Sequence, residues 1–123
     1  MSRFDEVLSY ALTLPEAWED HPWGDTVVKV RKKIFLFIGQ DDDGGVRLSI
    51  KLGESHGHAM SLPGATPPGY GLGKAGWVSL TVGKKGPGLD LLSDWVDESY
   101  RLVAPKRLAA LLDGREDGQL ADA

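Results

Sequence analysis

The chain has 123 residues, a formal net charge of -4 and no cysteine. This length suits one domain with its own hydrophobic core. The absence of cysteine excludes disulfide scaffolds, thiolate zinc sites and cysteine nucleophiles. No apolar run approaches the roughly 20 residues that span a membrane. The first segment is acidic where a signal peptide would be cationic and apolar, so we expect a cytoplasmic protein.

The charges are segregated along the chain. Residues 1–25 have a net charge of -5, residues 26–89 of +5 and residues 90–123 of -4. Overall acidity therefore does not exclude an anionic partner, provided that the positive side chains of the middle segment share one face.

The first 25 residues predict one helix and a connection. Ser2 is suited to cap the helix. Apolar residues then recur at helical spacing, at Phe4, Val7, Leu8 and Ala11. Residues 15–25 contain two prolines and two tryptophans and show neither a strand nor a helix period. We expect an ordered surface connection there.

Three antiparallel strands are predicted next, over residues 26–31, 34–38 and 46–52, with turns at 32–33 and 41–45. Basic and apolar residues alternate in the first and third of these strands. This alternation places four cations on the face away from the core, namely Lys29, Arg31, Arg47 and Lys51. A further strand is predicted over residues 77–82.

The remaining elements are helical. We expect a short helix over residues 54–62, a long loop to residue 76, an amphipathic helix from Leu89 to Val103 and a last short helix after Pro105. The fold class is then α+β, a two-layer sandwich of one antiparallel sheet with helices packed on one face. We expect the domain to span residues 1–112 and residues 113–123 to form a polar, frayed tail.

Several short motifs, in this order and spacing, resemble the MmcQ/YjbR family over nearly the whole chain. They are Leu14-Pro15-Glu16, Asp20-His21-Pro22-Trp23-Gly24, Val28-Lys29-Val30, Lys33-Ile34-Phe35, Leu48-Ser49-Ile50-Lys51, Pro68-Gly69-Tyr70, Lys74-Ala75-Gly76-Trp77-Val78 and Asp97-Glu98-Ser99-Tyr100-Arg101-Leu102-Val103. The resemblance implies a CyaY-like, frataxin-like α+β fold and DNA as the partner, although fold alone does not decide function.

The leading candidate site is a cationic and aromatic face. Cations from adjacent strands would neutralise phosphates, and aromatic rings would stack on bases, as in single-strand binders. The candidate residues are Lys29, Arg31, Arg47, Lys51, Tyr70, Lys74 and Trp77. Alternatively, the cations are ordinary solvated residues and the two aromatic residues close the edge of the core. Our hypothesis is a non-enzymatic binding module for DNA or another anionic ligand.

A second candidate is a small-ligand pocket or protein contact built from Trp18, His21 and Trp23. The two tryptophans alternatively close the end of the sheet against the first helix. No cofactor is implied by the sequence, and we expect a monomer.

Metal binding and catalysis have weaker signals. His56 and His58 lack a clear third ligand. The frataxin-like resemblance also suggests iron on an acidic ridge formed by Asp5, Glu6, Glu16, Glu19 and Asp20, although these carboxylates also suit helix termini and solubility. No nucleophile elbow, Walker A loop or zinc-protease motif is present.

Overall fold

A computed structural model describes residues 3–22, 26–40, 45–63, 65–66, 76–83 and 87–112 of the chain. The labelled elements are α1 (Arg3–Leu12), β1 (Ala17–Asp20), β2 (Thr26–Val30), β3 (Lys33–Gln40), β4 (Val46–Lys51), α2 (His56–Met60), β5 (Trp77–Val82) and α3 (Leu89–Val103). A further helical segment covers residues 106–112. The expected α+β class and the expected single domain are confirmed.

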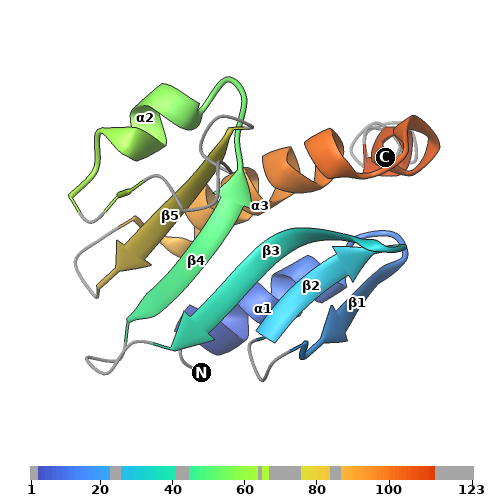
Figure 1. Cartoon of the computed structure of the whole chain (residues 1–123), viewed down its shortest axis with the longest axis horizontal. Helices are drawn as coiled ribbons and strands as arrows, with labels where there is room; N and C mark the ends of the chain where they lie inside the picture. The colour runs from blue at the N-terminus through green and yellow to red at the C-terminus, as the bar shows by residue number, and fades with distance from the viewer. Residues whose placement is uncertain are drawn as a thin grey trace, which may run out of the picture.

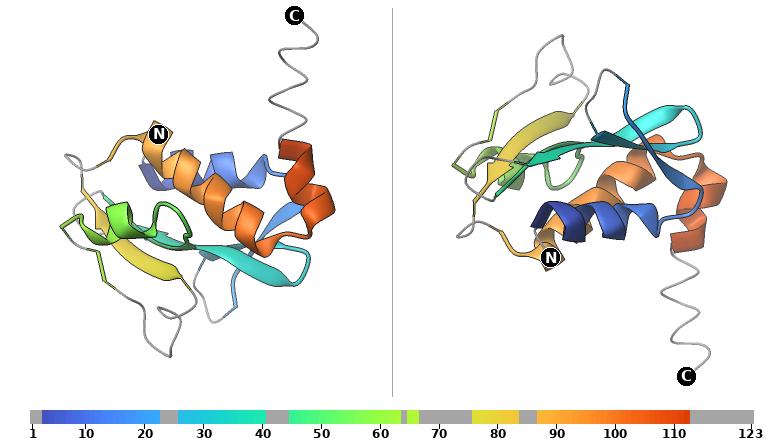
Figure 2. Two further views of the ribbon diagram at one scale, coloured as in Figure 1. Left: turned by 90° about the horizontal axis from the view of Figure 1, so that it is seen from above. Right: turned by 90° about the horizontal axis from the view of Figure 1, so that it is seen from below.

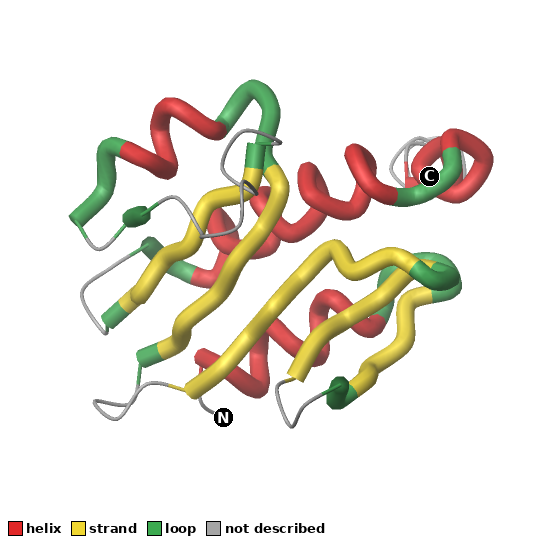
Figure 3. Tube along the Cα trace, viewed as in Figure 1, coloured by secondary structure: helices red, strands yellow, loops and turns green. Residues whose placement is uncertain are grey.

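The five strands form one antiparallel sheet in the order β1-β2-β3-β4-β5 (Figures 1 and 3). Figure 2 shows α1, α3 and the last helical segment on one side of this sheet. No helix of the described residues packs across the other side, the open face, which faces the viewer in Figure 1. The short helix α2 lies beyond β5, where His58 packs edge-on against Trp95 of α3 with ring centroids 5.6 Å apart.

The expected connection over residues 15–25 is wrong in part, because Ala17–Asp20 forms the edge strand β1. Its burial pattern is irregular, and this explains why alternation did not reveal the strand. The strand is specified by its pairing with β2, in which Ala17 lies opposite Val30 and Asp20 opposite Val27. Tertiary pairing therefore overrides the weak local pattern.

A β-bulge and a buried hydroxyl organise the centre of the sheet. The β2–β3 register shifts by one residue, since Val28 lies opposite Leu36 but Lys29 lies opposite Ile34, and Phe35 is left without a partner on β2. Phe35 and Leu36 are both fully buried. β3 and β4 remain paired only as far as Leu36, and beyond that point they diverge (Figure 1).

Ser99 of α3 bridges the two diverging strands. Its hydroxyl donates to the Phe35 carbonyl at 2.6 Å and accepts from the Lys51 backbone N–H at 2.9 Å. Ser99 and Phe35 are fully buried and Lys51 is half-buried, so the Phe35 carbonyl in particular depends on the hydroxyl for its hydrogen bond. One side chain thus replaces a missing rung of the sheet ladder and ties α3 to both strands.

The neighbours of Ser99 attach α3 to three other segments. Asp97 accepts a hydrogen bond from the Tyr10 hydroxyl of α1 at 2.5 Å. Glu98 accepts hydrogen bonds from the backbone N–H groups of Gly53 and Ser55, before α2. Tyr100 donates its hydroxyl to the Pro15 carbonyl at 2.6 Å and packs edge-on against Phe35. Burial, reinforced by the Glu16 carboxylate, raises the pKa of Tyr100, and so the hydroxyl remains a donor.

The other expected strands and helices agree with the structure to within a few residues, and the strand over residues 77–82 has the expected bounds. The expected turn at 41–45 and the expected tail at 113–123 lie wholly or mainly outside the described residues. None of the helices in the described part of the chain is long and apolar enough to cross a membrane.

Removing the Ser99 hydroxyl should destabilise the whole fold. Ser99→Ala leaves a buried carbonyl and a backbone N–H unpaired, and we expect a loss of about 2–4 kcal/mol in the free energy of unfolding. Urea denaturation measures this loss, and the urea m-value should stay unchanged if the native state keeps its compactness. Ser93→Ala, on the same helix at a half-buried site, is the matched control and should change stability little. Equal stability of the two variants would contradict the bridging role of Ser99.

Candidate functional site

The open face carries the side chains that alternate with the core residues of each strand. The register places Lys51 opposite Trp77, Ser49 opposite Ser79 and Arg47 opposite Thr81 on β4 and β5. On β3, Phe37 lies opposite Ser49 and Gly39 opposite Arg47. Because opposite residues of a sheet share a face, these side chains form one surface.

Lys29 of β2 lies on the open face, but its charge is compensated there. Its Nζ is 2.8 Å from a carboxylate oxygen of Asp20 and 5.1 Å from the ring centroid of Trp18. The hydrogen bond from Lys29, followed by the one from the His21 backbone N–H, lowers the pKa of Asp20. Asp20 is therefore ionised at neutral pH, and its carboxylate is a local partner for Lys29.

Arg31 is not on a strand as expected, because β2 ends at Val30. It lies in the β2–β3 turn with a φ of 56°, a conformation that an arginine rarely adopts. Its carbonyl accepts a hydrogen bond from Trp18 Nε1 at 2.8 Å, and its Nε is 3.5 Å from a carboxylate oxygen of Glu16. This second cation is thus also beside a carboxylate from the N-terminal segment.

Arg47 and Lys51 of β4 differ from the first two cations. Among the described residues, neither has a carboxylate within ion-pair distance. Arg47 is exposed, and one of its guanidinium nitrogens is 3.4 Å from the Gln40 carbonyl. The same nitrogen would be 3.5 Å from a Cβ at Gly39, so the guanidinium lies across that glycine. These two side chains are the uncompensated cations of the described open face.

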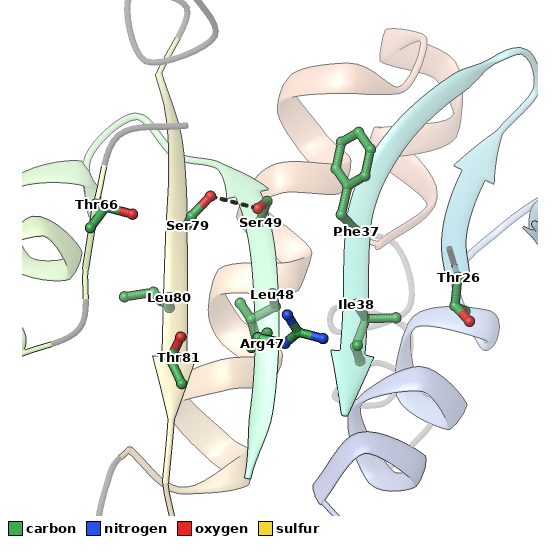
Figure 4. Close-up of a pocket in the computed structure, with 11 residues that line it drawn as sticks. Thr26, Phe37, Ile38, Arg47, Leu48, Ser49, Thr66, Ser79, Leu80 and Thr81 are labelled. Carbon is green, nitrogen blue, oxygen red and sulfur yellow. Dashed lines mark hydrogen bonds between the residues drawn. The ribbon is translucent and has the colours of Figure 1, made fainter. Parts of the chain in front are cut away.

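A shallow pocket of about 300 Å³ lies beside Arg47 on the open face. Figure 4 shows Phe37 projecting from β3 toward one end, and the Arg47 guanidinium extending from β4 toward β3. Ser49 of β4 and Ser79 of β5 point toward each other, with their hydroxyl oxygens 2.7 Å apart. The lining residues are Thr26, Phe37, Ile38, Gly39, Arg47, Leu48, Ser49, Thr66, Ser79, Leu80 and Thr81.

The aromatic side chains of the open face are arranged unequally. Phe37 and Trp77 meet edge-on with ring centroids 5.6 Å apart. Trp77 is 8% exposed, which leaves little of its ring accessible, whereas Phe37 is half-buried and lines the pocket. Trp18 is 43% exposed at the other edge of the sheet. Phe37 and Trp18 are therefore the rings that a ligand could contact on the described surface.

The structure brings together only part of the set expected from the sequence. Lys29, Arg47, Lys51 and Trp77 share the open face, whereas Tyr70, Lys74 and Trp23 lie outside the described residues. The exposure of Trp18 shows that it does not close the core against α1, as one alternative had it. His21 is exposed and lies 2.8 Å from Glu19.

The residues weighed as weak metal-ligand candidates do not converge in the described part of the chain. His56 and His58 belong to the short helix α2, and His58 packs on Trp95. Within the ranges that the structure describes, no three His, Asp or Glu side chains are grouped so that they could hold a metal ion. The carboxylates of Glu16 and Asp20 serve instead as partners of Arg31 and Lys29.

Sequence reasoning missed the polar and aromatic lining of the pocket. Phe37 was hidden within a continuous apolar run, and Ser49 and Ser79 were unremarkable members of two alternating strands. The alternation did place both serines on the non-core face. Only the register, which pairs them across β4 and β5, brings their hydroxyls into contact.

The chain is similar in fold and in sequence to known proteins. A crystal structure of a protein from Pseudomonas syringae superposes with a TM-score of 0.60 and 21% sequence identity, covering 80% of this chain and 97% of that one. At this identity the likeness shows the fold alone. No curated protein matches the sequence. The YjbR family model matches residues 12–102, which include all five strands and nearly all of α3, and this chain therefore belongs to the YjbR family.

Proposed function

We propose that this protein is a non-enzymatic binding module that holds single-stranded DNA across its open face. The observation that carries the proposal is the placement of Arg47 and Lys51 beside Phe37, with no carboxylate partner for either cation among the described residues. Uncompensated cations attract phosphates, and an accessible ring provides a surface on which a base stacks.

The geometry favours a single strand over a duplex as the DNA form. The open face presents a sheet with side-chain rings, and stacking on such rings requires bases that are not already paired. Each stacked base contributes about 1–3 kcal/mol without regard to its identity. The DNA partner itself comes from the family resemblance, and the two uncompensated cations support an anionic partner of this kind.

The cations of residues 26–89 are not expected to contribute equally to DNA binding. Glu16 and Asp20 belong to the N-terminal segment of net charge -5, and they lie beside Arg31 and Lys29. Exposed ion pairs are weak, so they reduce rather than abolish the attraction of these cations for phosphate. Binding centred on β4, with a weaker contribution from β2, is the expected result.

Neutralising the two β4 cations should weaken DNA binding and reduce its salt dependence. For Arg47→Gln combined with Lys51→Gln, we expect an affinity loss of at least about tenfold at low salt and a log–log salt slope smaller by about 1.4, since each phosphate contact on a single strand contributes about 0.7. Fluorescence anisotropy with a labelled thymidine oligonucleotide measures both quantities. Duplex DNA of the same length forms a second arm and should bind more weakly.

The control for this experiment removes the same charge from the helix layer. Lys106→Gln combined with Arg107→Gln changes two exposed cations of the last helical segment, on the other side of the sheet (Figure 2). These changes should leave the affinity near that of the unmodified protein. No binding by the unmodified protein at low salt, or equal losses in the two double variants, would overturn the proposal.

Releasing Lys29 from its partner should strengthen binding. Because the pKa of Asp20 is lowered, its carboxylate holds Lys29 at neutral pH, and it releases Lys29 only as the pH falls through that lowered value. Asp20→Asn frees the cation at pH 7, and we expect an affinity gain of about two- to fivefold, as for an exposed ion pair.

Two further variants identify the source of that gain. Asp94→Asn removes one exposed carboxylate from α3 and should have a much smaller effect. Adding Lys29→Gln to Asp20→Asn should cancel the gain. If Asp20→Asn and Asp94→Asn raise the affinity equally, the change reflects net charge alone, and Lys29 does not contact the strand.

A further inference from the structure

The pocket on the open face differs from the rest of that surface in its chemistry. It combines one cationic group, hydroxyl groups from neighbouring strands and one aromatic ring within a hollow of about 300 Å³. This volume is at the lower end of the range for small-molecule sites, which hold a few polar groups in fixed positions. A phosphate-neutralising surface alone would need neither the hollow nor the hydroxyls.

We propose that this pocket is a nucleotide subsite, which takes one phosphate on Arg47 and the attached base against Phe37. The inference rests on the proposed function and deepens it, because it assigns one unit of the bound strand to a defined place. A free nucleoside monophosphate has the same chemistry and could occupy the same pocket.

The spacing of the two groups suits a base and its own phosphate. Phe37 pairs with Ser49 and Gly39 pairs with Arg47, so the backbone positions of Phe37 and Arg47 are offset by two residues along neighbouring strands. This offset is about 6.7 Å along the strand direction. The sugar of a nucleotide separates its base from its phosphate over a comparable distance, and Figure 4 shows both side chains on the same side of the sheet.

The Arg47 guanidinium extends from β4 over β3, where a phosphate can reach it. No side chain larger than a methyl group occupies the space at Gly39 where the guanidinium lies across the strand, and the Gln40 carbonyl is 3.4 Å from one of its nitrogens. A guanidinium has five N–H donors, so most remain available for phosphate oxygens.

The serine pair adds hydrogen-bonding groups at the Phe37 end of the pocket, since Ser49 lies opposite both Phe37 and Ser79. Ser49 Oγ and Ser79 Oγ are 2.7 Å apart, so one hydroxyl donates to the other. The accepting hydroxyl keeps its own hydrogen, and both oxygens keep lone pairs. The pair therefore presents a donor and acceptors to a ligand in the pocket while satisfying itself in the absence of a ligand.

The test uses four probes with the full chain: deoxythymidine monophosphate, thymidine, inorganic phosphate and a thymidine oligonucleotide. Amide shifts of Gly39, Arg47 and Ser79 in ¹H–¹⁵N spectra report on the pocket. We expect the monophosphate to shift these signals and to bind at least about tenfold more tightly than thymidine or phosphate, because only the monophosphate engages both ends. Binding of the monophosphate no tighter than that of phosphate would overturn the inference.

Three variants separate the pocket from general electrostatics. Phe37→Leu removes the ring and should cost about fivefold or more in monophosphate affinity, as expected for lost stacking. Gly39→Val would fill the space under the guanidinium and should also weaken binding. Gly39→Ala is its matched control, because a Cβ there makes only ordinary contacts with Arg47. Thermal unfolding of each variant confirms that the fold is retained.

The outcomes distinguish this inference from the function on which it rests. If the oligonucleotide binds and depends on Arg47 and Lys51, but neither Phe37→Leu nor Gly39→Val affects it, the strand crosses the open face and the subsite is refuted. If the monophosphate binds in the pocket but the oligonucleotide does not bind, the subsite stands for a free nucleotide and the DNA function is refuted.

Discussion

The architecture depends on the buried hydroxyl of Ser99, which joins two strands that no longer reach each other. The bulge at Phe35 turns β3 away from β4, and a sheet opened in this way would leave the Phe35 carbonyl and the Lys51 N–H without partners. Ser99 satisfies both groups and fixes the height of α3 over the sheet. Its neighbours Asp97, Glu98 and Tyr100 then attach the same helix to α1, to the segment before α2 and to the start of β1.

This arrangement decides which surface remains for a ligand. Because the described helices α1 and α3 pack on one side of the sheet, the alternating side chains of β3, β4 and β5 are left on the other side. The segment that contains the edge strand β1 determines which described cations of that surface have a carboxylate nearby. This segment supplies carboxylates to the cations of β2 and the following turn, while the cations of β4 have no such partner among the described residues. This difference supports the proposal that an anionic ligand binds near β4.

Membership of the YjbR family and the likeness to a solved structure determine the fold but not the ligand, since one fold can carry many functions. The ligand that the open face can hold depends on the chemistry of a few side chains. A guanidinium across a glycine, a hydrogen-bonded serine pair and an accessible ring lie together in one hollow. Of the motifs that carry the family resemblance, the one around Ser99 serves packing, and the one around Ser49 contributes to the pocket.

The sequence by itself determined the class of the fold, nearly all of the helices and four of the five strands. These elements have periodic apolar patterns that each segment carries alone, and the same alternation placed Lys29, Arg47 and Lys51 on the non-core face. Only the tertiary structure decided the rest. The strand β1, the pairing of Lys29 with Asp20 and the meeting of Ser49 with Ser79 depend on register between segments. Register is a property of paired strands, and no single segment contains it.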